Sequence, residues 1–127
     1  MDLLLDTHTA LWWLADDPNL SAHAAALIAD RQNTVQASAV SGYAIGLMVR
    51  RGQLATPIAQ EFAACLAQAS IPALALELSH TTAGALLDWD HDDPCDRLIA
   101  AQARLEGCVL VSANPAFDRL KGFFRTW

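Results

Sequence analysis

This chain of 127 residues lacks the features that mark secreted and membrane-spanning proteins. It has only three cysteines, with no C-x-x-C spacing, which is typical of buried thiols in a reducing compartment. No stretch approaches the roughly twenty apolar residues needed to cross a bilayer. The N-terminus carries acids where a signal peptide carries positive charge. We therefore expect a cytoplasmic protein with no membrane-spanning segment.

Basic residues are also scarce. Eight Lys and Arg against fourteen Asp and Glu give a net charge of −6, which argues against nonspecific binding of nucleic acid through a large basic face. An acidic balance suits a carboxylate pocket that needs metal cations before it meets phosphates, and ordinary surface solvation explains it equally well. Hydrophobic residues make up 54% of the chain and charged residues 17%. This apolar composition indicates a surface covered by a partner or by a second copy.

The length predicts one domain spanning residues 1–127, with room for a real core but not for two. No repeat, low-complexity segment or linker interrupts it. The predicted strands are 3–5, 34–37, 72–76 and 108–111, and the tail through Trp127 is a candidate edge strand. The predicted helices are 8–15, 22–30, 38–51, 57–69, 80–87 (with Ser79 as its cap) and 94–106, followed by a short helical turn from Asn114-Pro115. Strands that alternate with helices predict an α/β fold with a mainly parallel sheet.

The most informative stretch is HDDPCDRLIAAQARLEGCVLVSAN, residues 91–114. Pro94 suits a first helical turn, and acids there favour the positive end of the helix. Apolar residues then recur at helical spacing until Gly107, a plausible stop, and a short buried strand follows. Asp93 and Asp96 therefore open a helix, and Asn114 lies just past the carboxyl end of a strand, where open α/β sheets bind ligands.

Polar side chains at the strand ends predict a site. Asp6 follows the first strand as Asn114 follows the late one, and parallel strands bring their carboxyl ends to one edge. We expect Asp6, Asp93, Asp96 and Asn114 to converge there. Oxygen ligands without Cys or paired His suit Mg²⁺ or Mn²⁺, and two such ions can promote phosphodiester hydrolysis. Plain structural roles compete with this interpretation: Asp6 or Thr7 can cap the first helix, and Asp93 can cap the late one.

Three segments resemble PIN-domain proteins of the VapC toxin family. LLLDTHTALWWLADDPNLS is similar to that family's opening strand with Asp-Thr-His. SAVSGYAIGLMVRRGQL resembles S-x-x-S-x-W-E-I-x-x-x-x-x-x-G-K-L, and HDDPCDRLIAAQARLEGCVLVSANPAF resembles H-R-D-P-F-D-R-L-L-I-A-Q-A with the Thr-x-Asp strand end. The resemblance implies a three-layer α/β/α sandwich, Mg²⁺-dependent ribonuclease activity, a homodimer and a small antitoxin partner that plugs the site.

The family's site has four acids, and this chain keeps two of them. Asp6 and Asp96 occupy the first and third positions, whereas Ala44 stands at the Glu position and Asn114 at the last Asp position. We therefore expect Asp6, Asp96 and Asn114 to be metal ligands around a pocket that Ala44 also lines, with weak binding of Mg²⁺ or Mn²⁺. Asp93 joins Asp6 and Asp96 as a catalytic candidate. The other departures from the family's motifs are Tyr43, Cys95 and Asp92.

Three functions stay open at this point. The first is a VapC-like endoribonuclease that cuts RNA with metal-activated water. The second is a degenerate PIN domain that binds RNA or a protein without cleaving, and the third is a structural partner held by an apolar dimer face. His8 and His91 are expected to be structural, and Arg97 is expected to pair with the acids of the late cluster.

Overall fold

A five-stranded sheet forms the centre of the computed structural model, which describes residues 1–127. The strand order is β3-β2-β1-β4-β5, and every neighbouring pair is parallel. The predicted parallel α/β sheet is confirmed, and the C-terminal tail supplies its edge strand. The strands are β1 (Asp2–Leu5), β2 (Thr34–Ser38), β3 (Ala73–Leu74), β4 (Val109–Val111) and β5 (Phe124–Thr126).

Six α-helices and one 3₁₀-helix connect these strands: α1 (Thr7–Leu14), α2 (Ala22–Ala29), α3 (Val40–Arg50), α4 (Thr56–Gln68), α5 (Leu78–Leu86), α6 (Pro94–Glu106) and η1 (Pro115–Arg119). The predicted cap of α5 is wrong, because the helix begins before Ser79. Glu77 is its N-cap, and the main-chain N–H of Glu77 donates to Nδ1 of His80 over 2.9 Å in a reciprocal capping box. No helix is both long and apolar enough to span a bilayer.

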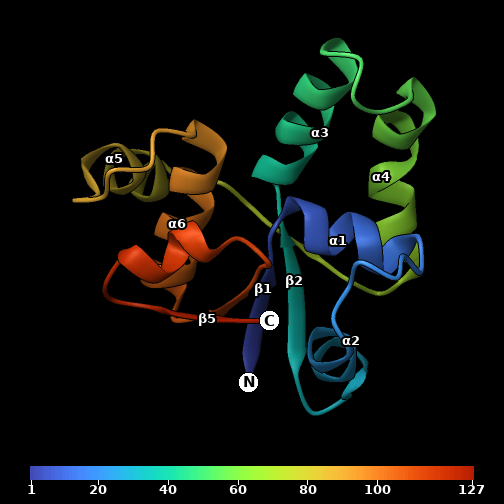
Figure 1. Ribbon diagram of the computed structural model, residues 1–127, viewed down its shortest axis with the longest axis horizontal. Coiled ribbons are helices and arrows are strands. Elements are labelled where there is room, and N and C mark those ends of the chain that lie inside the picture. The colour runs from blue at the N-terminus through green and yellow to red at the C-terminus, as the bar shows by residue number, and fades with distance from the viewer.

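Helices cover both faces of the sheet, as the alternating side chains of β1 require. Leu3 and Leu5 pack in one core cluster with side chains of α1, α2 and α4, whereas Leu4 packs in a second cluster with residues of α6. All three leucines are fully buried. In Figure 1, α5 and α6 lie on one side of β1 and β2, and α1, α2 and α4 lie on the other. The predicted three-layer α/β/α arrangement is confirmed.

Arg97 stabilises the segment that connects α5 and α6 through hydrogen bonds. The prediction that it pairs with the neighbouring acids is wrong, because its guanidinium donors go to main-chain carbonyl oxygens at the end of α5 and in the segment that follows it. Gly84 lets the helices approach closely, since a Cβ there would lie 3.2 Å from the Arg97 carbonyl oxygen. These contacts hold the N-terminus of α6 in place. The five acceptors are the carbonyl oxygens of Gly84, Ala85, Leu87, Trp89 and His91.

Candidate active site

A cleft of about 270 Å³ lies at the carboxyl edge of the sheet. Four segments that are distant in sequence form it: the start of α1, one side of α3 with the turn that follows, the start of α6, and the loop after β4. Asp6, Asp93, Asp96 and Asn114 all line this cleft, and so does Ala44. The topology therefore brings the sequence-predicted residues together, and their chemical roles stay predictions.

Asp6 is rigidly held at the base of the cleft. It is the N-cap of α1 and is only 8% exposed. Its Oδ1 accepts hydrogen bonds from the main-chain N–H of Thr9, at 3.0 Å, and from the Thr9 hydroxyl, at 2.7 Å. Both bonds use the same oxygen, so Oδ2 remains available to another partner. Asp6 thus serves as a helix cap and can present one carboxylate oxygen to the cleft.

Asp96 lies on the first turn of α6, half-buried, and is bound by a histidine. Oδ2 of Asp96 and Nε2 of His91 are 2.7 Å apart. Burial raises the pKa of the Asp96 carboxyl, the charges of Asp93 and Asp6 raise it further, and the hydrogen bond from His91 opposes them. Carboxylates that crowd one another in this way are relieved by a cation. His91 acts on Asp96, as a structural histidine would, and does not line the cleft.

Asp93 and Asn114 each use one oxygen for a helix cap. Oδ1 of Asp93 accepts from the main-chain N–H of Asp96 at 2.9 Å, at the N-cap of α6. Oδ1 of Asn114 accepts from the N–H of Ala116 at 3.0 Å, at the N-cap of η1. Asn114 has no second oxygen, so its ability to bind a cation is smaller than that of the exposed Asp93 carboxylate.

The donor set fits one hydrated divalent ion better than two. No three His, Cys, Asp or Glu side chains come close enough together to hold a metal ion by themselves. Mg²⁺ is usually bound through one or two carboxylates and keeps several waters. Asp6 and Asp96 can supply those carboxylates. Ala44 is buried in the wall of the cleft and offers no side-chain oxygen, so a second ion lacks ligands.

Two polar residues of the cleft were not among the predicted site residues. Arg51 and Gln53 line it from the turn after α3, on either side of Gly52. Gly52, with a positive φ of 73°, marks the turn that ends α3. The turn borders the cleft because α3 projects beyond the carboxyl edge of the sheet (Figure 1), and no signal in the sequence indicates this direction.

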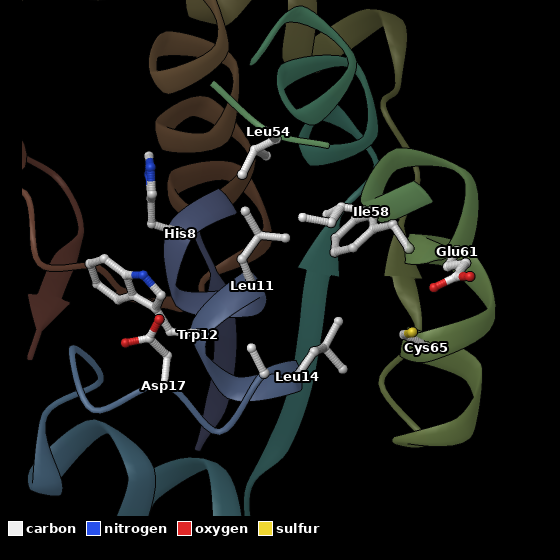
Figure 2. A pocket seen from close by; sticks show the side chains of 11 residues that line it. His8, Leu11, Trp12, Leu14, Asp17, Leu54, Ile58, Glu61 and Cys65 are labelled. Atoms are coloured by element: carbon white, nitrogen blue, oxygen red, sulfur yellow. The ribbon is translucent and has the colours of Figure 1, made fainter. Parts of the chain in front are cut away.

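A second hollow, of about 360 Å³, lies between α1 and α4. We call it the apolar groove. Figure 2 shows Leu11 and Leu14 of α1 across this groove from Ile58 of α4. Asp17 and Glu61 are the acids among its lining residues. His8 lines both hollows, so the apolar groove adjoins the cleft.

Comparisons with known proteins agree with this architecture. The VapBC2 complex of Rickettsia felis, solved with a DNA fragment from its promoter, contains a similar chain with a TM-score of 0.71 and 17% identity, covering 100% of this chain and 99% of that one. DNA-bound VapBC from Salmonella typhimurium gives a TM-score of 0.70 and 17% identity, over 99% and 97%. FitAcB from Neisseria gonorrhoeae gives a TM-score of 0.59 and 15% identity, covering 98% of this chain and 96% of that one.

At these identities the structural likenesses show the fold alone. No curated protein sequence matches the chain. The family model described as the PIN domain matches residues 3–122, which is nearly the whole chain. This protein therefore belongs to the PIN-domain family, as its sequence resemblance predicted.

Proposed function

We propose that this protein is a metal-dependent endoribonuclease of the VapC kind, the toxin of a toxin–antitoxin pair acting in the cytoplasm. The observation that carries the proposal is the cleft at the carboxyl edge of the sheet. Asp6 and Asp96, which are distant in sequence, line it together with Asp93. Membership of the PIN-domain family and the likeness to chains of VapBC complexes support the same conclusion.

The reaction is hydrolysis of an RNA phosphodiester. Water adds to phosphorus, one P–O ester bond breaks, and the leaving oxygen takes a proton. Asp6 and Asp96 would hold Mg²⁺ or Mn²⁺, which supplies a more acidic bound water and positive charge at the phosphate. Thr9 keeps the Asp6 carboxylate in place, and His91 keeps that of Asp96. Asp93, an exposed carboxylate that lines the cleft, would accept a proton from the attacking water.

A second candidate is a PIN domain that binds RNA or a protein without cleaving. Ala44 and Asn114 favour it, because both line the cleft where the resemblance implies carboxylates. Loss of two ligand charges weakens the binding of a hard cation. The two functions differ in one measurable property: the first requires metal-dependent turnover, and the second requires binding alone.

An antitoxin partner has a suitable surface in the apolar groove. Most residues that line it are hydrophobic, and Asp17 and Glu61 add negative charge. An apolar peptide segment that also carries Arg or Lys complements such a surface. We propose that the antitoxin inserts this kind of segment into the groove, next to the cleft that His8 shares with it. Ile58→Glu should then abolish complex formation.

Assembly of two copies is also part of the proposal. Several large apolar side chains remain exposed, among them Leu78 at 81%, Leu86 at 84% and Phe124 at 79%. A homodimer would cover such side chains, and a stable one buries at least about 1,000 Å² in total. Light scattering on the purified chain, with and without its partner, measures the assembly directly.

The deciding experiment is RNA cleavage by antitoxin-free protein as Mg²⁺ or Mn²⁺ is added. Asp6→Asn and Asp96→Asn should each abolish metal-dependent cleavage. Asp88→Asn is the matched control, because Asp88 is an exposed acid outside the cleft. If the protein binds RNA but does not cleave it at any metal concentration, the nuclease proposal is rejected and the binding-module function is retained.

A further inference from the structure

Arg51 is the one guanidinium among the residues that line the cleft. Its side chain is exposed, and none of the ion pairs within 4 Å includes it. The other arginines with assigned partners are committed elsewhere: Arg97 to carbonyl oxygens, Arg119 to Asp90 and Arg125 to Asp118. The guanidinium of Arg51 is therefore available to a ligand in the cleft.

The turn that carries Arg51 is rigid. Arg51 is the C-cap of α3, and the next two N–H groups bond back to the helix, Gly52 to Val49 O at 3.0 Å and Gln53 to Met48 O at 2.8 Å. This pair of bonds is the Schellman motif. It holds the Gln53 amide on the same side of the cleft as Arg51. The backbone that carries the two donor side chains is thus fixed before any ligand arrives.

Arg51 acts on the same space as the acids of α6. Arg51 lines the cleft from the turn after α3, and Asp93 and Asp96 line it from the start of α6. A positive group and a cluster of carboxylates therefore face one cavity without forming an ion pair within 4 Å. A phosphate with its own cation fits between them, because each charge on it then meets an opposite one.

The absence of carboxylates at Ala44 and Asn114 suggests a role for the positive charge of Arg51. In two-metal phosphodiester hydrolysis both ions stabilise charge on the reacting oxygens. Asp6 and Asp96 can hold one ion, and Ala44 and Asn114 stand where the family resemblance implies two further carboxylates. A guanidinium binds phosphate in a bidentate manner and keeps its charge at any physiological pH.

We infer that Arg51, with the Gln53 amide beside it, binds the phosphodiester of the RNA strand and supplies the positive charge that a second metal ion would otherwise provide. This inference rests on the proposed nuclease function and adds a substrate-binding residue to it. Asp6 and Asp96 would then hold the one remaining ion on the other side of the same phosphate.

The test compares Arg51→Gln with Arg50→Gln. Arg50 is the adjacent arginine, is also exposed, and does not line the cleft, so both variants lose one charge from the end of α3. Binding of a short fluorescein-labelled single-stranded RNA is measured by anisotropy in an Asp6→Asn background that prevents cleavage. Arg51→Gln should weaken binding roughly tenfold and reduce the slope of log K against log salt by about 0.7, the value for one phosphate contact on a single strand.

Two further measurements make the result decisive. Arg51→Lys, which restores the charge, should recover part of the binding, and Mn²⁺ affinity of Arg51→Gln by calorimetry should equal or exceed that of the unaltered protein. Equal RNA binding by Arg51→Gln and the parent, an equal loss with Arg50→Gln, or lost Mn²⁺ binding would each overturn the inference while leaving the nuclease proposal intact. If the unaltered protein neither binds nor cleaves RNA with metal present, both fail together.

Discussion

Nε2 of His91 donates to Oδ2 of Asp96 across 2.7 Å, and the His91 ring packs on Trp89 with their centroids 4.7 Å apart. Trp89 in turn donates through its indole N–H to the carbonyl oxygen of Ala116, in the segment after β4. The chain of contacts therefore joins the two loops that border the cleft. It also fixes which oxygen of Asp96 remains available to a cation.

This relationship predicts that His91 governs metal affinity without touching the metal. Partners that orient a ligating carboxylate typically change metal affinity by about 10- to 100-fold when they are removed. His91→Ala should therefore weaken Mn²⁺ binding, measured by calorimetry, by at least about tenfold. His91→Gln, which can still donate to Asp96, should retain more of the affinity. His23→Ala, at a histidine outside the cleft, is the control, and unchanged affinity in His91→Ala would contradict the prediction.

The raised pKa of Asp96 predicts how stability without metal depends on pH. A carboxyl whose pKa is raised in the folded state binds its proton more tightly there than in the unfolded chain. It therefore stabilises the folded protein at a pH below the ordinary carboxyl pKa of 3.8, and this stabilisation is lost as the pH rises through the raised pKa. Asp96→Asn keeps a neutral group at every pH. Its Tm should exceed that of the unaltered protein at about pH 7, and the two should converge near pH 3. Mn²⁺ should raise the Tm of the unaltered protein and leave that of Asp96→Asn unchanged.

Much of this architecture could be predicted because it follows from local patterns. Leu3, Leu4 and Leu5 form an unbroken apolar run before Asp6, which indicates a strand buried on both faces and a polar group at its carboxyl end. Because parallel strands have their carboxyl ends at one edge of the sheet, the strand pattern alone predicts that Asp6 and Asn114 lie at the same edge. Gly107 ends α6 in the left-handed conformation, with a φ of 67°, as a glycine at that position favours.

The errors arise where the partner is a main-chain group. Carbonyl oxygens have no signature in a sequence, so nothing distinguished the carbonyl acceptors of Arg97 from the acids close to it in the chain. The α5 start was missed because Glu77 and His80 cap the helix jointly, and a Glu–His pair is a rarer cap than Ser79.

Arg97 should be a determinant of stability. Its donors satisfy five carbonyl oxygens between Gly84 and His91, and removing a charged partner of buried or half-buried groups costs about 1.5–3 kcal/mol for each well-formed bond, without simple additivity. Arg97→Ala should lower the free energy of unfolding by at least about 3 kcal/mol in urea titrations. Arg97→Lys should recover little, because an ammonium cannot reach the same fork of acceptors. Arg104→Ala, elsewhere on α6, is the comparison, and an equal small loss in both would refute the anchoring role.

Restoring the two missing acids separates a weakened enzyme from a binding module. Ala44 and Asn114 line the same cleft as Asp6 and Asp96, so Ala44→Glu with Asn114→Asp would add two anionic oxygen donors to one cavity. If the remaining groups are arranged for hydrolysis, the double variant should bind Mg²⁺ more tightly and cleave RNA much faster. Each single change should give little, because residues that act as one catalytic unit are strongly non-additive.

The same double variant should be less stable than the parent without metal. Added carboxylates repel Asp6, Asp93 and Asp96 and would raise the pKa of some members of the cluster. Mg²⁺ should restore the lost stability, since it binds the folded cleft and not the unfolded chain. Thermal unfolding with and without Mg²⁺, alongside RNA cleavage, measures both effects. If the unaltered protein cleaves RNA as fast as the double variant, one metal ion and the existing side chains suffice for hydrolysis. Asp93 and Arg51 would then be the next residues to substitute. Tight Mg²⁺ binding by the double variant with no cleavage would show that the restored ligands alone do not make a nuclease, and the binding module would then be the better account.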